Sequence, residues 1–167
     1  LITYQNRNPA LPDGNPFEGV FLGWYWTNTT AAINPAYAWY VHLEGGRMFY
    51  GRKTEFRLVW PVRGVGSGVL PATGQRECFD IEGRPIACDG TGQDGHLRMG
   101  AAWPKRRLET NGETVFDHLT GLVWTRYADL SGSWTTWEGA FETVAYLRRR
   151  GYGGRSAWSL PTINELE

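Results

Sequence analysis

The sequence predicts an α+β fold in which short strands come first and one complete helix follows. Three patterns support this: aromatic strand-like segments within residues 23–63, two hairpins within residues 77–88 and 114–125, and one helical apolar stripe within residues 135–151. The chain has 167 residues, with 22 glycines, 9 tryptophans and 8 tyrosines. That length suits one core, and the composition is typical of an exported β-rich module.

The first group of expected strands occupies residues 23–27, 37–43, 48–50 and 56–63. A turn at 44–47 joins the second strand to the third. Pro61 should lie at an edge or a bulge, because it has no N–H to donate to a ladder. The glycine-rich residues 64–68 then form the one credible linker.

Two cysteines flank the next expected turn, at Glu82-Gly83. This hairpin can bring Cys78 and Cys88 within bridging distance, and a cross-link would help an isolated hairpin to persist. The alternatives are two free thiols or two metal ligands, but close cysteine pairs and companion histidines are absent. We favour a disulfide, and with it an oxidising compartment.

A second hairpin and the complete helix follow. The hairpin strands are residues 114–117 and 122–125, joined by residues 118–121. A capping box of Thr135 and Glu138 should begin the helix, and Gly151 should end it. Its apolar stripe is Trp137, Ala140, Phe141, Val144 and Leu147.

The two ends of the chain predict one helix split between them. Thr162 and Glu165 form a second capping box close to the C-terminus. Joining the ends places Ile163, Leu166, Leu1 and Ile2 on one apolar stripe of helical period. We expect these four residues to pack together, either in a circularly permuted domain or between successive periods of a repetitive chain.

Several motifs, taken in order, resemble a DUF1566 domain, the module named after the C-terminal domain of a Legionella collagen-like adhesin. The first two thirds of that domain resemble residues 69–75, 78–88, 90–95, 117–124, the Trp137 helix and 160–166, and its last third resembles residues 25–30, 38–41 and 60–63. Residues 1–63 therefore match the last third of the domain, residues 64–70 a junction, and residues 71–167 the first two thirds. The order is inverted, and together the parts make about one domain equivalent.

The resemblance implies a C-type-lectin-like architecture, with short twisted antiparallel sheets packed against helices. The turn at residues 160–162 into a helix also resembles the corresponding turn in formylglycine-generating enzymes, which share that broad fold and need reactive cysteines in the terminal third. Residues 1–66 contain no cysteine, which argues against that activity. The calcium-binding sugar motifs of C-type lectins are absent as well.

Catalytic and metal chemistry have little support in the sequence. His42, His96 and His118 have no nucleophile or carboxylate at an informative spacing, so we expect no enzyme. Asp80, Asp89 and Asp94 surround the cysteine hairpin and a glycine-rich loop, where their oxygens would suit calcium. Aspartate is also a common turn former, and no other cofactor is expected.

Two groups of residues are candidates for a partner or glycan surface. Arg148, Arg149 and Arg150 would suit an acidic polymer, although the negative end of the helix dipole also explains them. The cluster 105–107 offers the same choice. Trp24, Tyr25, Trp26 and Tyr37 flank loops and are the aromatic candidates.

The balance of charge excludes a broad attraction to nucleic acid or to an anionic membrane, because Lys+Arg and Asp+Glu are both 17. No apolar run is long enough to span a bilayer, and an export signal, if there was one, has been removed. We therefore expect a non-enzymatic structural or adhesive module outside a bacterial cell, on its surface or in its periplasm. It would assemble head to tail with copies of itself or adjacent domains, as a filament or tandem array. The alternative is a carbohydrate-binding module for acidic glycans, and a surface protein is a further candidate partner.

Overall fold

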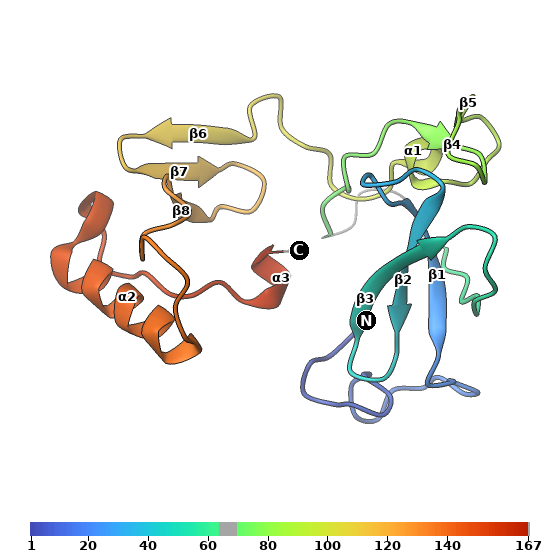
Figure 1. The fold of residues 1–167 in the computed structure, drawn as a ribbon, viewed down its shortest axis with the longest axis horizontal. Coiled ribbons are helices and arrows are strands. Elements are labelled where there is room, and N and C mark those ends of the chain that lie inside the picture. The colour runs from blue at the N-terminus through green and yellow to red at the C-terminus, as the bar shows by residue number, and fades with distance from the viewer. Residues whose placement is uncertain (64–69, 167) are drawn as a thin grey trace. The chain divides into compact units, whose positions relative to one another are not determined.

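A computed structural model describes residues 1–63 and 70–166 and divides the chain into two compact units. Unit 1 is Leu1–Ala102 and unit 2 is Trp103–Glu167. The described elements are three short antiparallel sheets, one long helix and several short helices, which confirms the α+β prediction (Figure 1). The predicted linker lies almost wholly outside the described residues, and the inverted order of domain parts stays a prediction.

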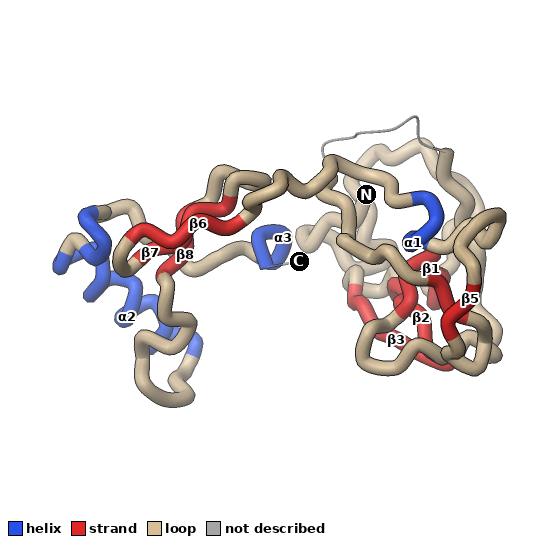
Figure 2. The backbone as a smooth tube through the Cα atoms, turned by 90° about the horizontal axis from the view of Figure 1, so that it is seen from above, coloured by secondary structure: helices blue, strands red, loops and turns tan. Residues whose placement is uncertain are grey.

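The main sheet of unit 1 has the order β1-β2-β3, with β1 at Trp24–Thr30, β2 at Tyr37–His42 and β3 at Arg47–Arg52 (Figure 2). Neighbouring strands are antiparallel, and β2 pairs with β3 from Tyr37↔Arg52 to His42↔Arg47. The predicted turn between β2 and β3 is confirmed. Gly46 has a φ of 68° and lies against Ile2, so a side chain there would be strained and would meet that residue.

Residues 56–63 form less of a strand than the sequence predicts. Leu58 makes an isolated parallel bridge to Tyr25. The Leu58 N–H donates to the carbonyl oxygen of Trp24 at 2.8 Å, and the Leu58 carbonyl oxygen accepts from the Trp26 N–H at 3.0 Å. The pairing does not extend toward Pro61, which has no N–H to continue a ladder.

The rest of unit 1 contains the cysteine hairpin and a short helix. Strands β4 (Cys78–Phe79) and β5 (Pro85–Ile86) form the predicted hairpin. Helix α1 (Asp94–Leu97) begins in the glycine-rich stretch, where the sequence predicts only a loop. It is a single turn that ends at Arg98, which has a φ of 47°.

Unit 2 contains a second sheet of order β6-β7-β8 (Figure 1). Its strands are β6 (Leu108–Asn111), β7 (Thr114–Asp117) and β8 (Val123–Thr125), all antiparallel to their neighbours. The β7–β8 hairpin confirms the prediction, whereas β6 was not predicted. Beyond the long helix, a 3₁₀ turn, η1, covers Tyr152–Gly154.

The long helix α2 spans Trp137–Arg150 and begins one residue later than the sequence predicts. Its N-cap is Thr136, whose hydroxyl oxygen accepts a hydrogen bond from the Gly139 N–H at 3.1 Å, so the assignment of Thr135 as N-cap is wrong. Two adjacent threonines offer the same cap chemistry, and the observed helix start selects the second. Gly151 ends the helix with a φ of 60°, as predicted.

The two chain ends differ in local structure. Helix α3 covers Ile163–Leu166, and the Glu165 carboxylate accepts a hydrogen bond from the Thr162 N–H at 2.7 Å, which is one of the two bonds of the predicted capping box. The second bond differs, because the Thr162 hydroxyl donates to the same carboxylate at 2.8 Å and the Glu165 N–H donates to the Thr162 carbonyl oxygen at 3.2 Å. Residues 1–5 are not helical, which differs from the predicted continuation of this helix. So short a segment has too few intrahelical bonds to form a helix by itself.

Candidate functional site

Unit 2 contains an open groove of about 920 Å³. It lies among β8, α2 and α3 and is lined mainly by apolar side chains, among them Val123, Ala140, Val144, Leu147, Trp158 and Leu160. This volume is within the range of sites that enclose a drug-sized ligand, so several side chains could enter it together. We call this feature the unit 2 groove.

The local sequence explains one wall of the groove. Ala140, Val144 and Leu147 follow a spacing of four and three residues, which places them on one face of α2. Val144 and Leu147 are buried with Trp158, and this small cluster is the buried apolar core described in unit 2. Trp158 is fixed by its indole N–H, which donates to the Tyr152 carbonyl oxygen at 3.0 Å.

The rim of the groove includes one residue predicted to act in assembly. Leu166 lines the groove and is 69% exposed, and Ile163 on the same helix is 49% exposed. Bonds from Thr162 hold the pKa of the Glu165 carboxyl below its usual range, which favours the charged form at this rim. Leu1 and Ile2 belong to unit 1, so their packing with Ile163 and Leu166 stays a prediction.

The main sheet of unit 1 has a half-exposed apolar face. Directly paired residues lie on the same face of an antiparallel sheet, which places Trp39 beside Tyr50 and Val41 beside Met48. Met48 and Tyr50 are 47% and 43% exposed. We call Tyr37, Trp39, Val41, Met48 and Tyr50 the outer face of the sheet.

The opposite face of the same sheet is an aromatic cluster. The ring of Trp24 packs edge-on against Tyr40, with centroids 5.1 Å apart, and Trp26 packs against Tyr40 at 5.5 Å. The Arg57 guanidinium lies over the Tyr40 ring at 4.6 Å. Trp24 and Trp26 are thus half-buried contributors to the stability of unit 1.

The remaining predicted aromatic partner residues lie elsewhere. Tyr25 contacts Trp60 and accepts a hydrogen bond from the Phe21 N–H at 3.0 Å. Tyr37 lies on the outer face, with the Arg52 guanidinium 5.7 Å from its ring centroid. The four aromatic residues proposed as one surface therefore divide between the two faces of the sheet.

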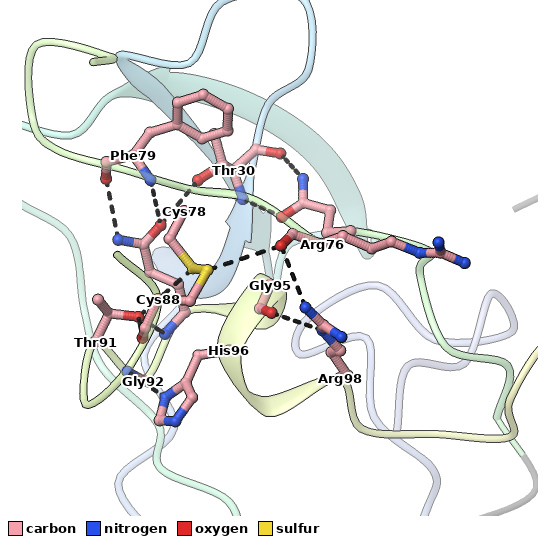
Figure 3. Close-up of a disulfide and its surroundings, with 12 residues drawn as sticks. Thr30, Arg76, Cys78, Phe79, Cys88, Thr91, Gly92, Gly95, His96 and Arg98 are labelled. Carbon is pink, nitrogen blue, oxygen red and sulfur yellow. Dashed lines mark hydrogen bonds between the residues drawn. A yellow bond between two sulfur atoms is a disulfide. The ribbon is translucent and has the colours of Figure 1, made fainter. Parts of the chain in front are cut away.

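Cys78 and Cys88 form a disulfide with a Cα–Cα distance of 5.2 Å, as predicted (Figure 3). The cysteine hairpin is fastened to the main sheet beside it. The Gln75 side chain bonds both the N–H and the carbonyl oxygen of Thr30, at the end of β1. The Lys53 ammonium donates to the carbonyl oxygens of Phe79 and Asp80 at 3.1 and 3.3 Å. These contacts join residues on both sides of the predicted linker within one compact unit.

The three aspartates considered for calcium do not gather into a site. Asp80 pairs with Arg84 at 2.7 Å, and the Arg84 backbone N–H is the main cause that lowers the pKa of the Asp80 carboxyl. Asp94 is buried and accepts hydrogen bonds from the Thr29 and Thr73 hydroxyls at 2.9 and 2.7 Å. Within residues 1–63 and 70–166, no group of three or more His, Cys, Asp or Glu could hold an ion, and Asp89 belongs to none.

Asp117 organises the turn of the hairpin in unit 2. Its carboxylate accepts from the Leu119 N–H at 3.0 Å and the Thr120 hydroxyl at 3.0 Å, and it pairs with Arg107 at 3.1 Å. Burial opposes ionisation, but these donors outweigh it and hold the pKa of the Asp117 carboxyl below its usual range. The segment from Asp117 to Gly121, which carries part of the family resemblance, therefore has a structural role.

The histidines serve separate local contacts. His42 is buried beside Trp24, with ring centroids 4.1 Å apart. His96 accepts from the Gly92 N–H at 3.3 Å. His118 lies 2.8 Å from Glu109, and this bond, followed by the Arg106 charge, lowers the pKa of the Glu109 carboxyl.

The arginines at the end of α2 are all exposed. Arg148 donates from Nε to the Trp158 carbonyl oxygen, and Arg150 donates to the Tyr146 hydroxyl at 3.0 Å. Among the described residues, none of Arg148, Arg149 and Arg150 forms an ion pair with a carboxylate. Their charges therefore face solvent.

Sequence reasoning missed two features of the candidate surfaces. The helical pattern predicts only an apolar stripe, whereas in the structure Ala140, Val144 and Leu147 of that stripe line an open groove. Residues 37–41 and 48–50 are all apolar or aromatic, so the alternation of side chains along a strand places such residues on both faces of this sheet. Only the strand register shows that these residues lie side by side.

No helix in the described part of the chain has the length and apolar character needed to cross a membrane. A family model described as the Lcl C-terminal domain matches residues 1–63 and 113–167, more than two thirds of the chain. No curated protein and no solved structure matches the chain. The family match confirms the resemblance to a DUF1566 module, and its two segments lie in different compact units.

Proposed function

The chain belongs to the Lcl C-terminal domain family, and on that premise we propose that it is a non-enzymatic adhesive or structural module that assembles head to tail. Domains of this family are secreted or surface-associated and of adhesin type. The Cys78–Cys88 disulfide supports export from the bacterial cell, because such bonds persist in oxidising compartments. A filament or a tandem array would both use the same contacts.

One observation carries the assembly part of this proposal. The two segments matched by a single family model lie in different compact units, and each unit exposes large apolar side chains. Met48 and Tyr50 are exposed in unit 1, and Leu166 at the groove rim is exposed in unit 2. Contiguous exposed apolar surface in a soluble module marks an interaction site.

Sedimentation velocity of the 167-residue chain over a wide concentration range tests this proposal. Head-to-tail contacts do not close on themselves, so the average mass should keep rising with concentration. A species that stays monomeric throughout contradicts assembly. A mass that stops at a dimer contradicts head-to-tail geometry, because self-complementary contacts close after one step.

Recognition of acidic glycans is a second candidate function. It is favoured by the last turn of α2, where Arg148, Arg149 and Arg150 are exposed and have no carboxylate partner among the described residues. Arg149 is the residue to change, because it has no described contact that supports the fold. Arg149→Glu should lower retention on immobilised heparin. Arg7→Glu is the matched control, since Arg7 is exposed, lies outside both basic clusters and already pairs with Glu44 at 3.1 Å. Equal retention of both variants and the wild type would exclude this turn as a glycan site.

A further inference from the structure

We propose that the unit 2 groove is the seat for the outer face of the main sheet from a second copy of this chain. The inference rests on the proposed head-to-tail assembly and identifies its two contact surfaces. One surface is the groove among β8, α2 and α3. The other is Tyr37, Trp39, Val41, Met48 and Tyr50 on β2 and β3.

The two surfaces come from the two segments of one family match. Every residue that lines the groove lies within 113–167, and the whole outer face lies within 1–63. Parts recognised by one domain model are expected to share one core. The first segment is therefore the natural occupant of a groove formed by the second.

The groove and the outer face also suit each other chemically. The groove is lined by Trp158, Leu160, Val144 and Leu147 among others, and Arg155 and Glu165 are the charged residues in its described lining. The outer face presents aromatic and aliphatic side chains from β2 and β3, and the charged residue beside them is Arg52, which pairs with Tyr37. Burial of such side chains is favourable by about 25 cal/mol for each Å² removed from water.

A short connection between the units favours a second copy over the same chain as the occupant. The backbone of Ala101 forms hydrogen bonds with Leu70 and Ala72 in unit 1. The Arg107 side chain forms a salt bridge with Asp117 in unit 2. Residues 102–106 alone join these anchored points, and the six steps from Ala101 to Arg107 reach only about 20–22 Å even when fully extended. Short hinges of this kind favour exchange of matching surfaces between copies.

Two blocking variants and their mixture test whether the unit 2 groove binds the outer face of a second copy. Ala140→Arg places a charged side chain in the groove and keeps a good helix former in α2. Met48→Arg places a charge on the outer face. Each variant alone should be monomeric in sedimentation velocity at concentrations where the wild type assembles.

An equimolar mixture of the two variants should form a 1:1 dimer and nothing larger. The groove of the Met48→Arg copy and the outer face of the Ala140→Arg copy are intact, so one contact is restored and no further one can follow. Glu142→Arg, on the exposed side of α2, and Ile33→Lys, at a 74% exposed apolar residue in unit 1, are the matched controls and should assemble like the wild type.

The outcomes distinguish the proposed contact between the groove and the outer face from the proposed head-to-tail assembly. If the wild type assembles and both blocking variants assemble equally well, head-to-tail assembly stands and the seat is wrong. Folded variants that stay monomeric when mixed would also overturn the pairing of these two surfaces. A wild type that is monomeric at every concentration overturns both proposals. Far-UV circular dichroism of each variant confirms that a loss of assembly is not a loss of folding.

Discussion

Unit 1 fastens its cysteine hairpin to the main sheet through the side chains of Gln75 and Lys53 and cross-links the hairpin itself with a disulfide, whereas unit 2 keeps its long helix beside an open groove with a small buried cluster. The buried apolar residues of unit 1 come from its N-terminal loop, its main sheet and the cysteine hairpin. Those of unit 2 are Val144, Leu147 and Trp158. Small units with a limited core need a cross-link or a partner, and the two units differ in which of these they have.

The largest effect should come from the core of unit 2. Leu147→Ala should lower its free energy of unfolding by about 2–5 kcal/mol, because it leaves a cavity among very few buried side chains. Hydrogen exchange resolved by segment should show faster exchange in β7, β8 and α2, with β1–β3 unchanged. Phe141→Ala, at a 47% exposed position of the same helix, is the control and should have a much smaller effect. Equal loss of protection in both units would show that they unfold together.

Removal of the disulfide should lower the stability of unit 1. Replacing Cys78 and Cys88 together by alanine should destabilise unit 1 by about 2–4 kcal/mol, because the reduced chain has more conformational freedom when unfolded. Thermal unfolding with and without a reductant measures this for the wild type, and the double variant should not respond to the reductant. Unchanged protection of β1–β3 in the variant would mean that Gln75 and Lys53 hold the hairpin without the cross-link.

Asp117 should make the stability of unit 2 depend on pH in the acidic range. Its folded pKa is below the unfolded value of about 3.9, so its contribution is complete above that value and is lost as the pH falls through the folded pKa. Asp117→Asn should cost about 1–3 kcal/mol at neutral pH, since Arg107 loses its charged partner. Denaturant unfolding at pH 7 and pH 3 should show a smaller decrease for the variant than for the wild type. Parallel decreases would assign the acid sensitivity to other carboxylates.

The smallest effect should come from the helix cap. Thr136→Ala should destabilise α2 by about 0.5–2 kcal/mol, because the Gly139 N–H loses its acceptor. Thr135→Ala is the neighbouring control and should change stability little. Urea unfolding midpoints compare the two. A larger effect at Thr135 would restore the capping box that the sequence predicts.

Local patterns in the sequence determined much of both units. The β2–β3 turn, the cysteine hairpin, the β7–β8 hairpin and the glycine that ends α2 follow from residue preferences over a few neighbouring positions. Their errors are also local. The sequence could not choose between Thr135 and Thr136, and residues 1–5 share an apolar pattern with α3 yet form no helix.

Only the tertiary structure decided which surfaces are covered. Strand register divides Trp24, Trp26 and Tyr37 between a packed face and a half-exposed one, because a shift of one residue exchanges the faces. Asp94 is saturated by hydroxyls from Thr29 and Thr73, which are far from it in sequence, so its spacing to other aspartates says nothing about calcium. The groove beside α2 exists because Val123, Leu147 and Trp158 converge from separate segments without filling the space between them. Periodicity identifies an apolar side, but long-range packing decides whether that side becomes core or stays open for a partner.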